Sequence, residues 1–224
     1  MNREYPISFS TEMVKAILAG QKSQTRRVIK PQPPEGVVKI CGPEWYEPGV
    51  VGKDGELKPG APIYGIYDSD GGWGIKCPYG PPGTILWVRE TWCVLDRDDR
   101  PLCYAYMADC EGQSDAWRPS VHMPRMAARL FLRVKGIRVE RLWSISEEDA
   151  RAEGIPACNE FLLDHKKTWC RYTVIAARSQ GREKPPTMAD NIGGFAYIWD
   201  KNYAERGYGW NLNPWVWVIE FERV

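Results

Sequence analysis

The sequence lacks several features that would each define a class of protein. No apolar run approaches the roughly 18 residues of a membrane-spanning helix, and residues 1–10 have neither the basic start nor the hydrophobic stretch of a secretion signal. No repeat or low-complexity tract is visible either. We therefore expect a cytoplasmic protein that has no membrane partner.

Close cysteine pairs are also missing. The 7 cysteines contain no C-x-x-C pair, which favours a reducing compartment over a disulfide framework. A zinc site built from Cys41, Cys77 and His122 would lack the close ligand pairs that such sites usually have, and packing of buried thiols is the simpler interpretation. We expect no metal site and no other cofactor.

The chain has almost no net charge, since 30 Lys and Arg against 29 Asp and Glu give +1. This balance excludes a general attraction to polyanions, so any contact with nucleic acid must come from local clusters of basic residues. Aromatic residues, in contrast, are abundant, with 11 Trp and 11 Tyr. Most lie in strand-like runs, where core packing explains them more simply than base stacking does.

Three short helices are predicted. Ser10 caps a helix over 11–19, whose apolar side chains repeat at helical spacing and which a glycine ends. Ser146 caps a second helix, which has an acidic first turn and ends at Gly154. A third helix covers about 191–203 and presents an apolar face.

Strands are predicted at 84–94, 101–107, 126–142 and 215–222. In the strand at 126–142 small and aliphatic residues alternate with basic ones, so a stripe of basic side chains that includes Arg129 lies on one face. This stripe is either a track for phosphates or a solvated outer face. In the last strand the alternation predicts two sets of side chains, with Trp217, Ile219 and Phe221 buried and Glu220 and Glu222 exposed.

Two stretches have the composition of insertions. Residues 31–82 are rich in Gly and Pro, with β-prone pieces at 37–40 and 63–67, which indicates an elaborated loop or a hairpin. Residues 156–190 carry many charges, which is typical of a mobile insertion. Several strands with few helices predict one α+β domain over 1–224, mainly β and barrel-like, which the last strand helps to close.

The order of several motifs along the chain resembles the ASCH family. These motifs are the AGQKSQTRR segment at 19–27, the strand GTILWVRETW at 83–92, the helix at 146–154 and the final strand WVWVIEFE. The resemblance implies a PUA-like β-barrel fold and a link to RNA and modified nucleosides. RPSVHMPR and GYGWNLNPWVWVIEFER also resemble ASCH proteins of bacteriophages and prophages, which would place the protein in a host cytoplasm.

The resemblance also implies a catalytic site. Small bacterial ASCH enzymes that hydrolyse 4-acetylcytidine to cytidine and acetate use a Lys, a Thr three residues later and a downstream Glu. These match Lys22, Thr25 and Glu153, and the Arg two residues beyond the Thr matches Arg27. This chain departs from those enzymes at Ser23, where they usually have Thr, and in its two insertions.

Amide hydrolysis needs a nucleophile, a base, stabilisation of the oxyanion and an acid for the leaving amine. Thr25 is the candidate nucleophile. Lys22 can act as the base if its pKa falls from about 10.4 toward 7, and burial or the neighbouring cations Arg26 and Arg27 act in that direction. A protonated Lys22 would instead contact an oxyanion or a phosphate. Glu153 lies at a helix C-terminus, which disfavours negative charge by about 0.3–1 kcal/mol and suits a proton shuttle, although its residue type also fits an exposed acid.

Further polar residues complete the predicted site. Arg89 and Glu90 are adjacent in a strand and point to opposite faces, so at most one of them faces inward. Trp92 could stack on a base, although core packing explains it equally well. The residues expected to contact substrate or nucleic acid are Ser23, Arg26, Arg27, Arg89, Glu90, Trp92 and Arg129.

The leading hypothesis is hydrolysis of the acyl amide on the exocyclic amine of a modified cytosine nucleoside. Two alternatives stay open. A non-catalytic reader would bind RNA or modified DNA through the basic segment and the barrel mouth, with an affinity that depends on salt. A ribonuclease would use a Lys and a carboxylate as acid and base for attack by a ribose 2′-hydroxyl.

Overall fold

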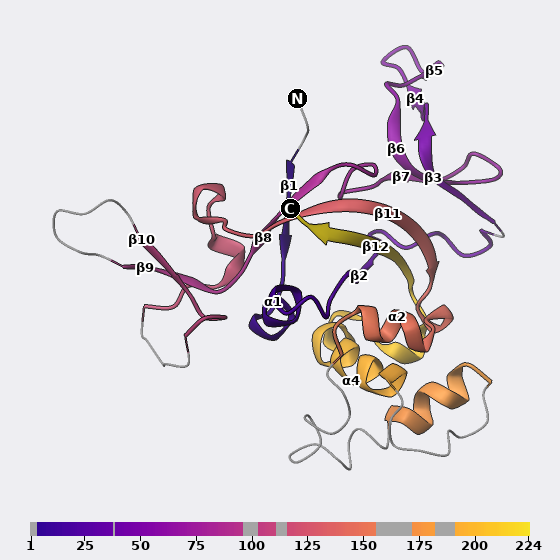
Figure 1. Cartoon of the computed structure of the whole chain (residues 1–224). Helices are drawn as coiled ribbons and strands as arrows, with labels where there is room; N and C mark the ends of the chain where they lie inside the picture. Colours follow the sequence, from indigo (N-terminus) through magenta and orange to yellow (C-terminus); the bar gives the residue numbers. More distant parts are fainter. Residues whose placement is uncertain (1–3, 38, 96–102, 111–115, 156–171, 182–190) are drawn as a thin grey trace.

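The protein is described by a computed structural model, in which strands form most of the regular structure and helices are few (Figure 1). The fold is therefore α+β. Among the residues that the structure describes, no helix has the length and apolar character needed to cross a membrane. The residues that the structure describes are 4–37, 39–95, 103–110, 116–155, 172–181 and 191–224.

A five-stranded sheet forms the centre of the molecule. Its strands, in spatial order, are β1 (Glu4–Ser8), β8 (Ile85–Arg89), β11 (Phe131–Arg141), β12 (Trp215–Arg223) and β2 (Gln24–Val28). β1 and β8 run parallel, and the other neighbours run antiparallel. Among the described strands β1 and β2 lie at the two edges, so this sheet is open. β12 is an inner strand of the sheet and does not close a barrel as expected.

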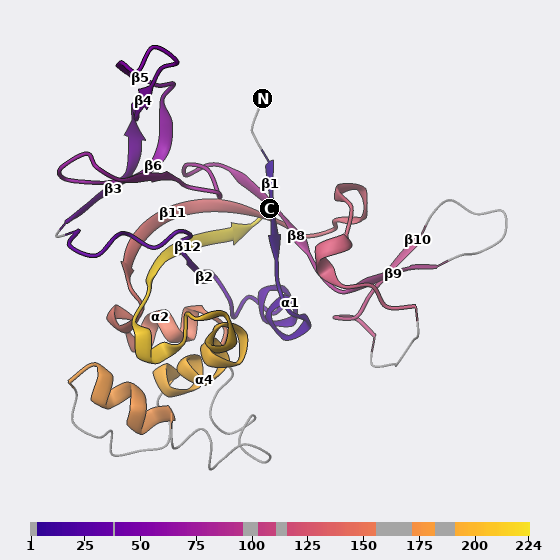
Figure 2. The same ribbon diagram turned by 180° about the vertical axis from the view of Figure 1, so that it is seen from behind.

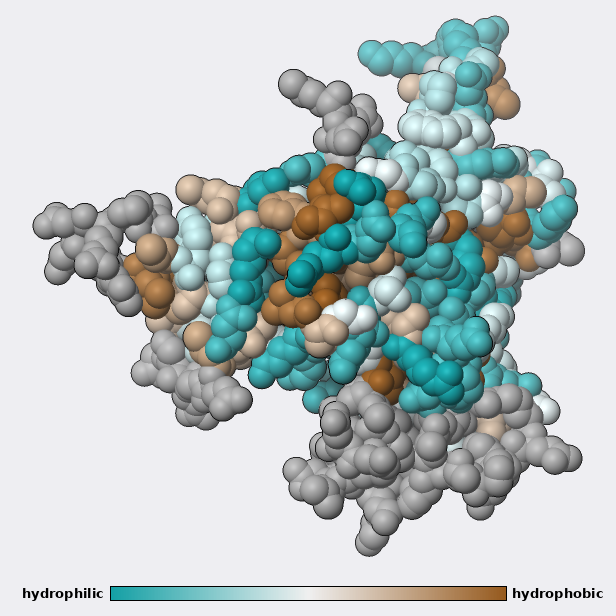
Figure 3. Space-filling view, in the orientation of Figure 1, coloured by the Kyte–Doolittle hydropathy of each residue, from teal (hydrophilic) through white to brown (hydrophobic). Residues whose placement is uncertain are grey.

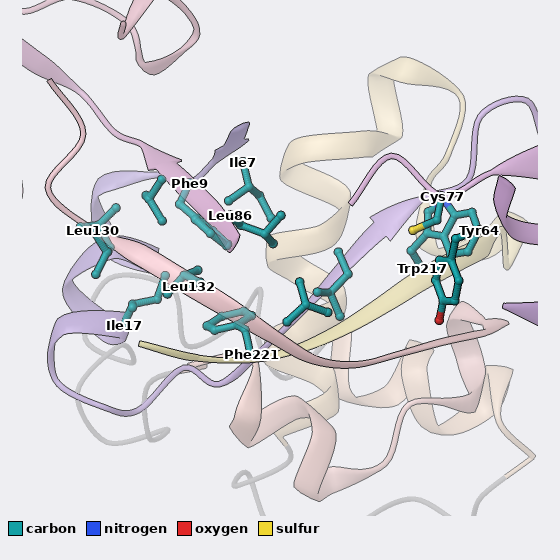
Figure 4. Close-up of a cluster of buried hydrophobic side chains, with 14 of the residues drawn as sticks. Ile7, Phe9, Ile17, Tyr64, Cys77, Leu86, Leu130, Leu132, Trp217 and Phe221 are labelled. Atoms are coloured by element: carbon teal, nitrogen blue, oxygen red, sulfur yellow. The ribbon is translucent and has the colours of Figure 1, made fainter. Parts of the chain in front are cut away.

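Both faces of the central sheet are covered. One face packs into a core that includes Phe9, Leu132 and Trp217 (Figure 4). The alternation predicted for β12 is confirmed on this face, but Val216 and Val218 on the other face are buried as well, because they pack into a second core with the helices. Coverage on both faces explains why the first half of this strand is apolar throughout.

The three predicted helices are confirmed, with ends that differ by at most two residues. The hydroxyl oxygens of Ser10 and Ser146 each accept a hydrogen bond from a backbone N–H of the first turn, as their capping role requires. Seen from behind, the second and third of these helices, labelled α2 and α4, lie together beyond the ends of β2 and β12 (Figure 2). The helices are α1 (Thr11–Leu18), α2 (Glu147–Ala152) and α4 (Asn191–Tyr203).

One carboxylate joins α2 to the start of α4. The Glu147 side chain accepts hydrogen bonds from the backbone N–H and the side-chain amide of Asn191, both at 3.1 Å. A carboxylate at a helix N-terminus satisfies free backbone donors and is favoured by the helix dipole. α2 and α4 are therefore held against each other, and both border the site described below.

The first insertion is a small β structure. β3 (Ile40–Tyr46), β6 (Ile63–Asp68) and β7 (Gly74–Lys76) form an antiparallel sheet, and β4 (Gly49–Val51) pairs with β5 (Leu57–Pro59) as a hairpin arm. The arm projects away from the central sheet and carries both hydrophilic and hydrophobic surface (Figures 1 and 3). The expected hairpin and the β-prone piece at 63–67 are thus confirmed, whereas the piece at 37–40 only reaches the start of β3.

Part of the second insertion is helical, since residues 172–179 form a helix. A Cβ atom on Gly193 of α4 would lie 2.7 Å from the Cα atom of Thr173, so this glycine allows the two helices to approach closely. The expectation of mobility falls mainly on 156–171 and 182–190, which lie outside the described residues.

Two predicted strands are shorter than expected. The strand at 84–94 is divided into β8 and β9 (Trp92–Leu95), and β9 pairs with β10 (Cys103–Tyr106). The strand at 126–142 begins only at Phe131, because a 3-10 turn over Arg125–Ala127 precedes it. Arg129 therefore lies before β11 and not within it.

Candidate functional site

Lys22 lies between the end of α1 and the start of β2, and its side chain is buried. Gly20 ends the helix region with a left-handed backbone, at φ 72°. The backbone N–H of Lys22 then donates to the carbonyl of Ala16 at 3.1 Å. An isolated antiparallel bridge pairs Lys22 with Glu153, which is 131 positions further along the chain. The two residues are thus placed by backbone geometry as well as by charge.

Lys22 and Glu153 form a buried ion pair. The Nζ atom of Lys22 donates to the Glu153 carboxylate at 2.8 Å and to the Glu153 backbone carbonyl at 2.7 Å. The two side chains are 0% and 4% exposed. A Cβ atom on Gly154, whose φ is 75°, would lie 2.8 Å from the Lys22 Cβ atom. The contact therefore depends on a glycine at position 154.

The pKa of Lys22 is shifted in the direction that a catalytic base needs. Burial lowers the pKa of the Lys22 ammonium below its ordinary value, Glu153 partly opposes this shift, and Arg27 and Arg26 add to it. The sequence predicted this direction from burial and from the two arginines. Desolvation is the larger of these two causes.

Arg26 lies among three carboxylates, and its side chain is fully buried. Its Nη1 atom donates to Glu153 at 3.3 Å, and its Nη2 atom donates to Glu140 at 2.5 Å and to Asp149 at 2.8 Å. Asp149 also accepts a hydrogen bond from Arg138 at 2.8 Å. Burial would raise the pKa of the Asp149 carboxyl, but Arg26 and Arg138 hold it below its usual range. The charge of Arg26 is therefore balanced inside the fold.

A cavity of about 340 Å³ opens beside this network. Thr25, Arg27 and Glu153 form part of its polar wall. Phe195 and Trp199 of α4 form part of its aromatic wall, to which Phe9 also contributes. The volume is within the roughly 300–1,000 Å³ that is typical of small-molecule sites.

The structure brings the three predicted catalytic residues to one place, but among the described residues no hydrogen bond joins Lys22 to Thr25. Lys22 and Glu153 touch directly, and Thr25 and Glu153 line the same cavity. Thr25 is held in register by its pairing with Ile219 of β12. Lys22 is not among the described residues of the cavity lining, so Glu153 lies between Lys22 and the cavity.

Phe9 links the cations of the site to the cavity. The guanidinium carbon of Arg27 is 4.9 Å from the centre of the Phe9 ring, and the Nζ atom of Lys22 is 5.8 Å from it. Arg27 also donates from Nη2 to the Ser8 carbonyl at 2.6 Å. Sequence reasoning missed Phe9, because one aromatic residue before a helix cap carries no signal for a site.

Four of the expected contact residues lie near β8 and β9 and are not part of the described cavity lining, although their neighbour Thr91 is. Glu90 is buried and accepts two hydrogen bonds from Arg129, at 2.9 and 3.0 Å. Trp92 packs in a small core with Met123 and stacks edge-on against Tyr104. Core packing thus accounts for Trp92. Of the adjacent charges Arg89 and Glu90, only Glu90 is fully buried, and Arg89 is half-buried. This agrees with the expectation that at most one of them faces inward.

Three arginines of the predicted basic stripe are paired with carboxylates, whereas Lys135 is exposed and forms no ion pair with a described residue. Arg129 binds Asp109 as well as Glu90, and Arg133 contacts Glu222 at 3.2 Å. Arg125 contacts Glu4 at 2.6 Å. These pairs favour a solvated outer face over a track for phosphates. Ser23, the remaining expected contact, is exposed next to the buried Lys22.

A second cavity of about 430 Å³ lies where the first insertion meets the central sheet. Tyr5, Trp45 and Lys76 are part of its lining, and it contains none of the described residues expected to act in catalysis. Within the described ranges no group of three or more His, Cys, Asp or Glu could hold a metal ion. The five cysteines in those ranges are free thiols, and burial raises the pKa of Cys77 to about 12.

Comparisons of the chain with models of known protein families, with curated proteins and with solved structures gave no match. The candidate site is therefore defined by its geometry. Its central feature is the buried Lys22 and Glu153 pair beside a cavity that Thr25 lines.

Proposed function

We propose that this chain is an ASCH-type protein with a PUA-like fold, organised as one domain over 1–224 with insertions at 31–82 and 156–190. In this proposal it acts on RNA or nucleosides and hydrolyses the acyl amide on the exocyclic amine of a modified cytosine nucleoside, as in 4-acetylcytidine. The observation that carries the proposal is the buried contact of Lys22 with Glu153 beside an aromatic cavity that Thr25 lines.

The aromatic wall of the cavity supports binding of a planar base. Phe9, Phe195 and Trp199 present ring surfaces, and stacking of a base on an aromatic side chain contributes about 1–3 kcal/mol. A base held against this wall would lie in the cavity that also contains the Thr25 side chain. The polar groups of the lining would then be available to the exocyclic amide.

In the proposed reaction the Thr25 hydroxyl oxygen adds to the acyl carbonyl carbon. Its proton passes to Glu153, which contacts both the cavity and the Lys22 Nζ atom at 2.8 Å. When the C–N bond breaks, the same proton goes to the departing cytosine amine. Water then hydrolyses the acyl-threonine ester, which releases the carboxylic acid and restores the Thr25 hydroxyl.

The lowered pKa of Lys22 supports this assignment. Because burial lowers the pKa of Lys22, Lys22 donates a proton to Glu153 more easily than an exposed lysine would. Lys22 therefore acts as a proton store behind Glu153 and does not contact the substrate. This arrangement differs from direct activation of Thr25 by the lysine, for which no Lys22 to Thr25 hydrogen bond is present among the described residues.

The reader alternative has less support. It needs several free cations along a surface, whereas Arg26 and Arg129 are paired with carboxylates and only Arg27 of these three has no carboxylate partner among the described residues. A base-sized cavity next to a buried lysine and carboxylate is better suited to a reaction on one nucleoside. No particular contact favours the ribonuclease alternative.

Incubation with 4-acetylcytidine tests the proposal. We expect the wild-type protein to produce cytidine and acetate, measured by liquid chromatography, and we expect Thr25→Val and Lys22→Ala to abolish production. Thr84→Val is the matched control, because Thr84 is another buried threonine but lies at the second cavity. A folded wild-type protein that turns over no acylated nucleoside would refute the proposal, and full activity of Thr25→Val would remove Thr25 as the nucleophile.

A further inference from the structure

The lining of the 340 Å³ cavity carries more positive than negative charge. Its charged side chains, among the described residues, are those of Arg26, Arg27, Arg206 and Glu153. Arg26 is balanced by carboxylates behind the cavity wall, and Glu153 is already shared between Arg26 and Lys22. The single carboxylate of the lining is therefore used inside the protein.

Arg27 and Arg206 remain without a carboxylate partner in the described structure. Arg27 donates to a neutral carbonyl, that of Ser8, and its Nε atom is buried without a hydrogen-bond partner among the described atoms. Arg206 is exposed in the 3-10 turn η4 (Ala204–Arg206) that follows α4, and it forms no ion pair with a described residue. Two positive charges on the lining are thus uncompensated, which attracts an anionic ligand.

The order of residues along α4 and the turn η4 indicates how the ligand is oriented in the cavity. Trp199, Tyr203 and Arg206 follow one another at helical spacing, and all three line the cavity. The Trp199 and Tyr203 rings contact each other, with their centres 4.3 Å apart. Trp199 is buried, Tyr203 is half-buried and Arg206 is exposed. The buried Trp199 ring inside the cavity is therefore followed, toward solvent, by the exposed guanidinium of Arg206.

We propose that the cavity takes a phosphorylated cytosine nucleoside, with the base against Trp199 and the phosphate ester bound by Arg206 and Arg27. A guanidinium group matches the geometry of phosphate oxygens and binds them through two parallel hydrogen bonds. The identity of the base rests on the proposed function, whereas the requirement for an anion rests on the charges of the lining. The phosphate is supplied either by a free nucleotide or by an RNA strand.

Calorimetric titration of the whole protein tests this inference without any turnover. We expect cytidine 5′-monophosphate to bind at least 10-fold more tightly than cytidine at low salt, with a difference that shrinks as the salt concentration rises. We expect Arg206→Gln to weaken binding of the monophosphate about 10-fold and to leave cytidine unchanged. Arg223→Gln is the control, because Arg223 is exposed and does not line the cavity.

The outcomes separate this inference from the proposed reaction. Equal affinity of wild-type protein for cytidine and its monophosphate, or equal weakening of both by Arg206→Gln, would overturn the phosphate contact, even if 4-acetylcytidine is hydrolysed. A clear preference for the monophosphate would support it, even if no hydrolysis occurs. A short oligonucleotide with a terminal cytidine distinguishes the sources, since tighter binding than the monophosphate indicates RNA and weaker binding indicates a free nucleotide.

Discussion

Replacement of Glu153 by Gln tests the buried ion pair at the centre of the site. The substitution keeps the size of the side chain and removes the negative charge 2.8 Å from the Lys22 Nζ atom. Loss of one partner of a buried pair costs about 3–5 kcal/mol, because the other charge is left without compensation. Arg26 keeps Glu140 and Asp149, so most of the loss comes from Lys22. We expect the free energy of unfolding to fall by about 3–5 kcal/mol at neutral pH.

The loss should depend on pH in a defined direction. Burial lowers the pKa of Lys22 below its ordinary value of 10.5, and Glu153 is the group that opposes this shift. Without Glu153 the pKa falls further, so the folded variant binds fewer protons than the unfolded chain between this lowered pKa and 10.5. The stability of the variant then rises with pH across that window, by up to about 1.4 kcal/mol per pH unit. Because the wild-type pKa is lowered less, the cost of Glu153→Gln falls as the pH rises from the lowered pKa of the variant to that of the wild type.

Urea denaturation followed by tryptophan fluorescence measures both quantities. Glu222→Gln is the matched control, because Glu222 pairs with Arg133 where both side chains are about half exposed, and such pairs contribute at most about 1 kcal/mol. Equal losses of unfolding free energy for the two variants would show that the Lys22 and Glu153 pair contributes no more than an exposed ion pair. A cost of Glu153→Gln that stays the same at every pH below 10.5 at which both proteins fold would refute the role of the Lys22 proton.

Two further predictions concern the surroundings of the site, and thermal unfolding measures both. Gly154→Ala should destabilise the protein by more than Gly181→Ala, because both positions have positive φ but only at Gly154 would the new Cβ atom meet Lys22. Equal losses would show that the close approach is unimportant. Arg129→Ala should cost about 3–5 kcal/mol, since it leaves the buried Glu90 carboxylate without its two hydrogen bonds, and a loss below about 1 kcal/mol would contradict this.

Local signals in the sequence located the helices well. Ser10 and Ser146 each cap a helix start, and Gly20 and Gly154 take the left-handed backbone that follows a helix. These signals involve residues that are near in sequence, so a pattern along the chain is enough to find them. The same holds for one buried face of β12, where alternation is visible.

Contacts between distant residues could not be predicted from such patterns. The strand at 84–94 is interrupted where Glu90 binds Arg129, 39 positions away, and no periodicity reports that pairing. Burial of Val216 and Val218 depends on helices elsewhere in the chain. In the site, Lys22 and Glu153 were placed together by resemblance to a family, whereas the carboxylates around Arg26 had no sequence signal that identified them as its partners.

The pairing of β2 with β12 has a consequence for the synthesis of the protein. Thr25 is fixed opposite Ile219, so β2 cannot complete its hydrogen bonds until almost all of the described chain has been made. At about 5–20 residues per second, a ribosome takes roughly 10–40 s to pass from one of these residues to the other. Until then the side of β2 that later binds β12 is unpaired, and other chains could join it. The part of the cavity wall that contains Thr25 is therefore among the last parts of the molecule to assemble, because a chain that stops before β12 lacks the strand that holds Thr25 in register.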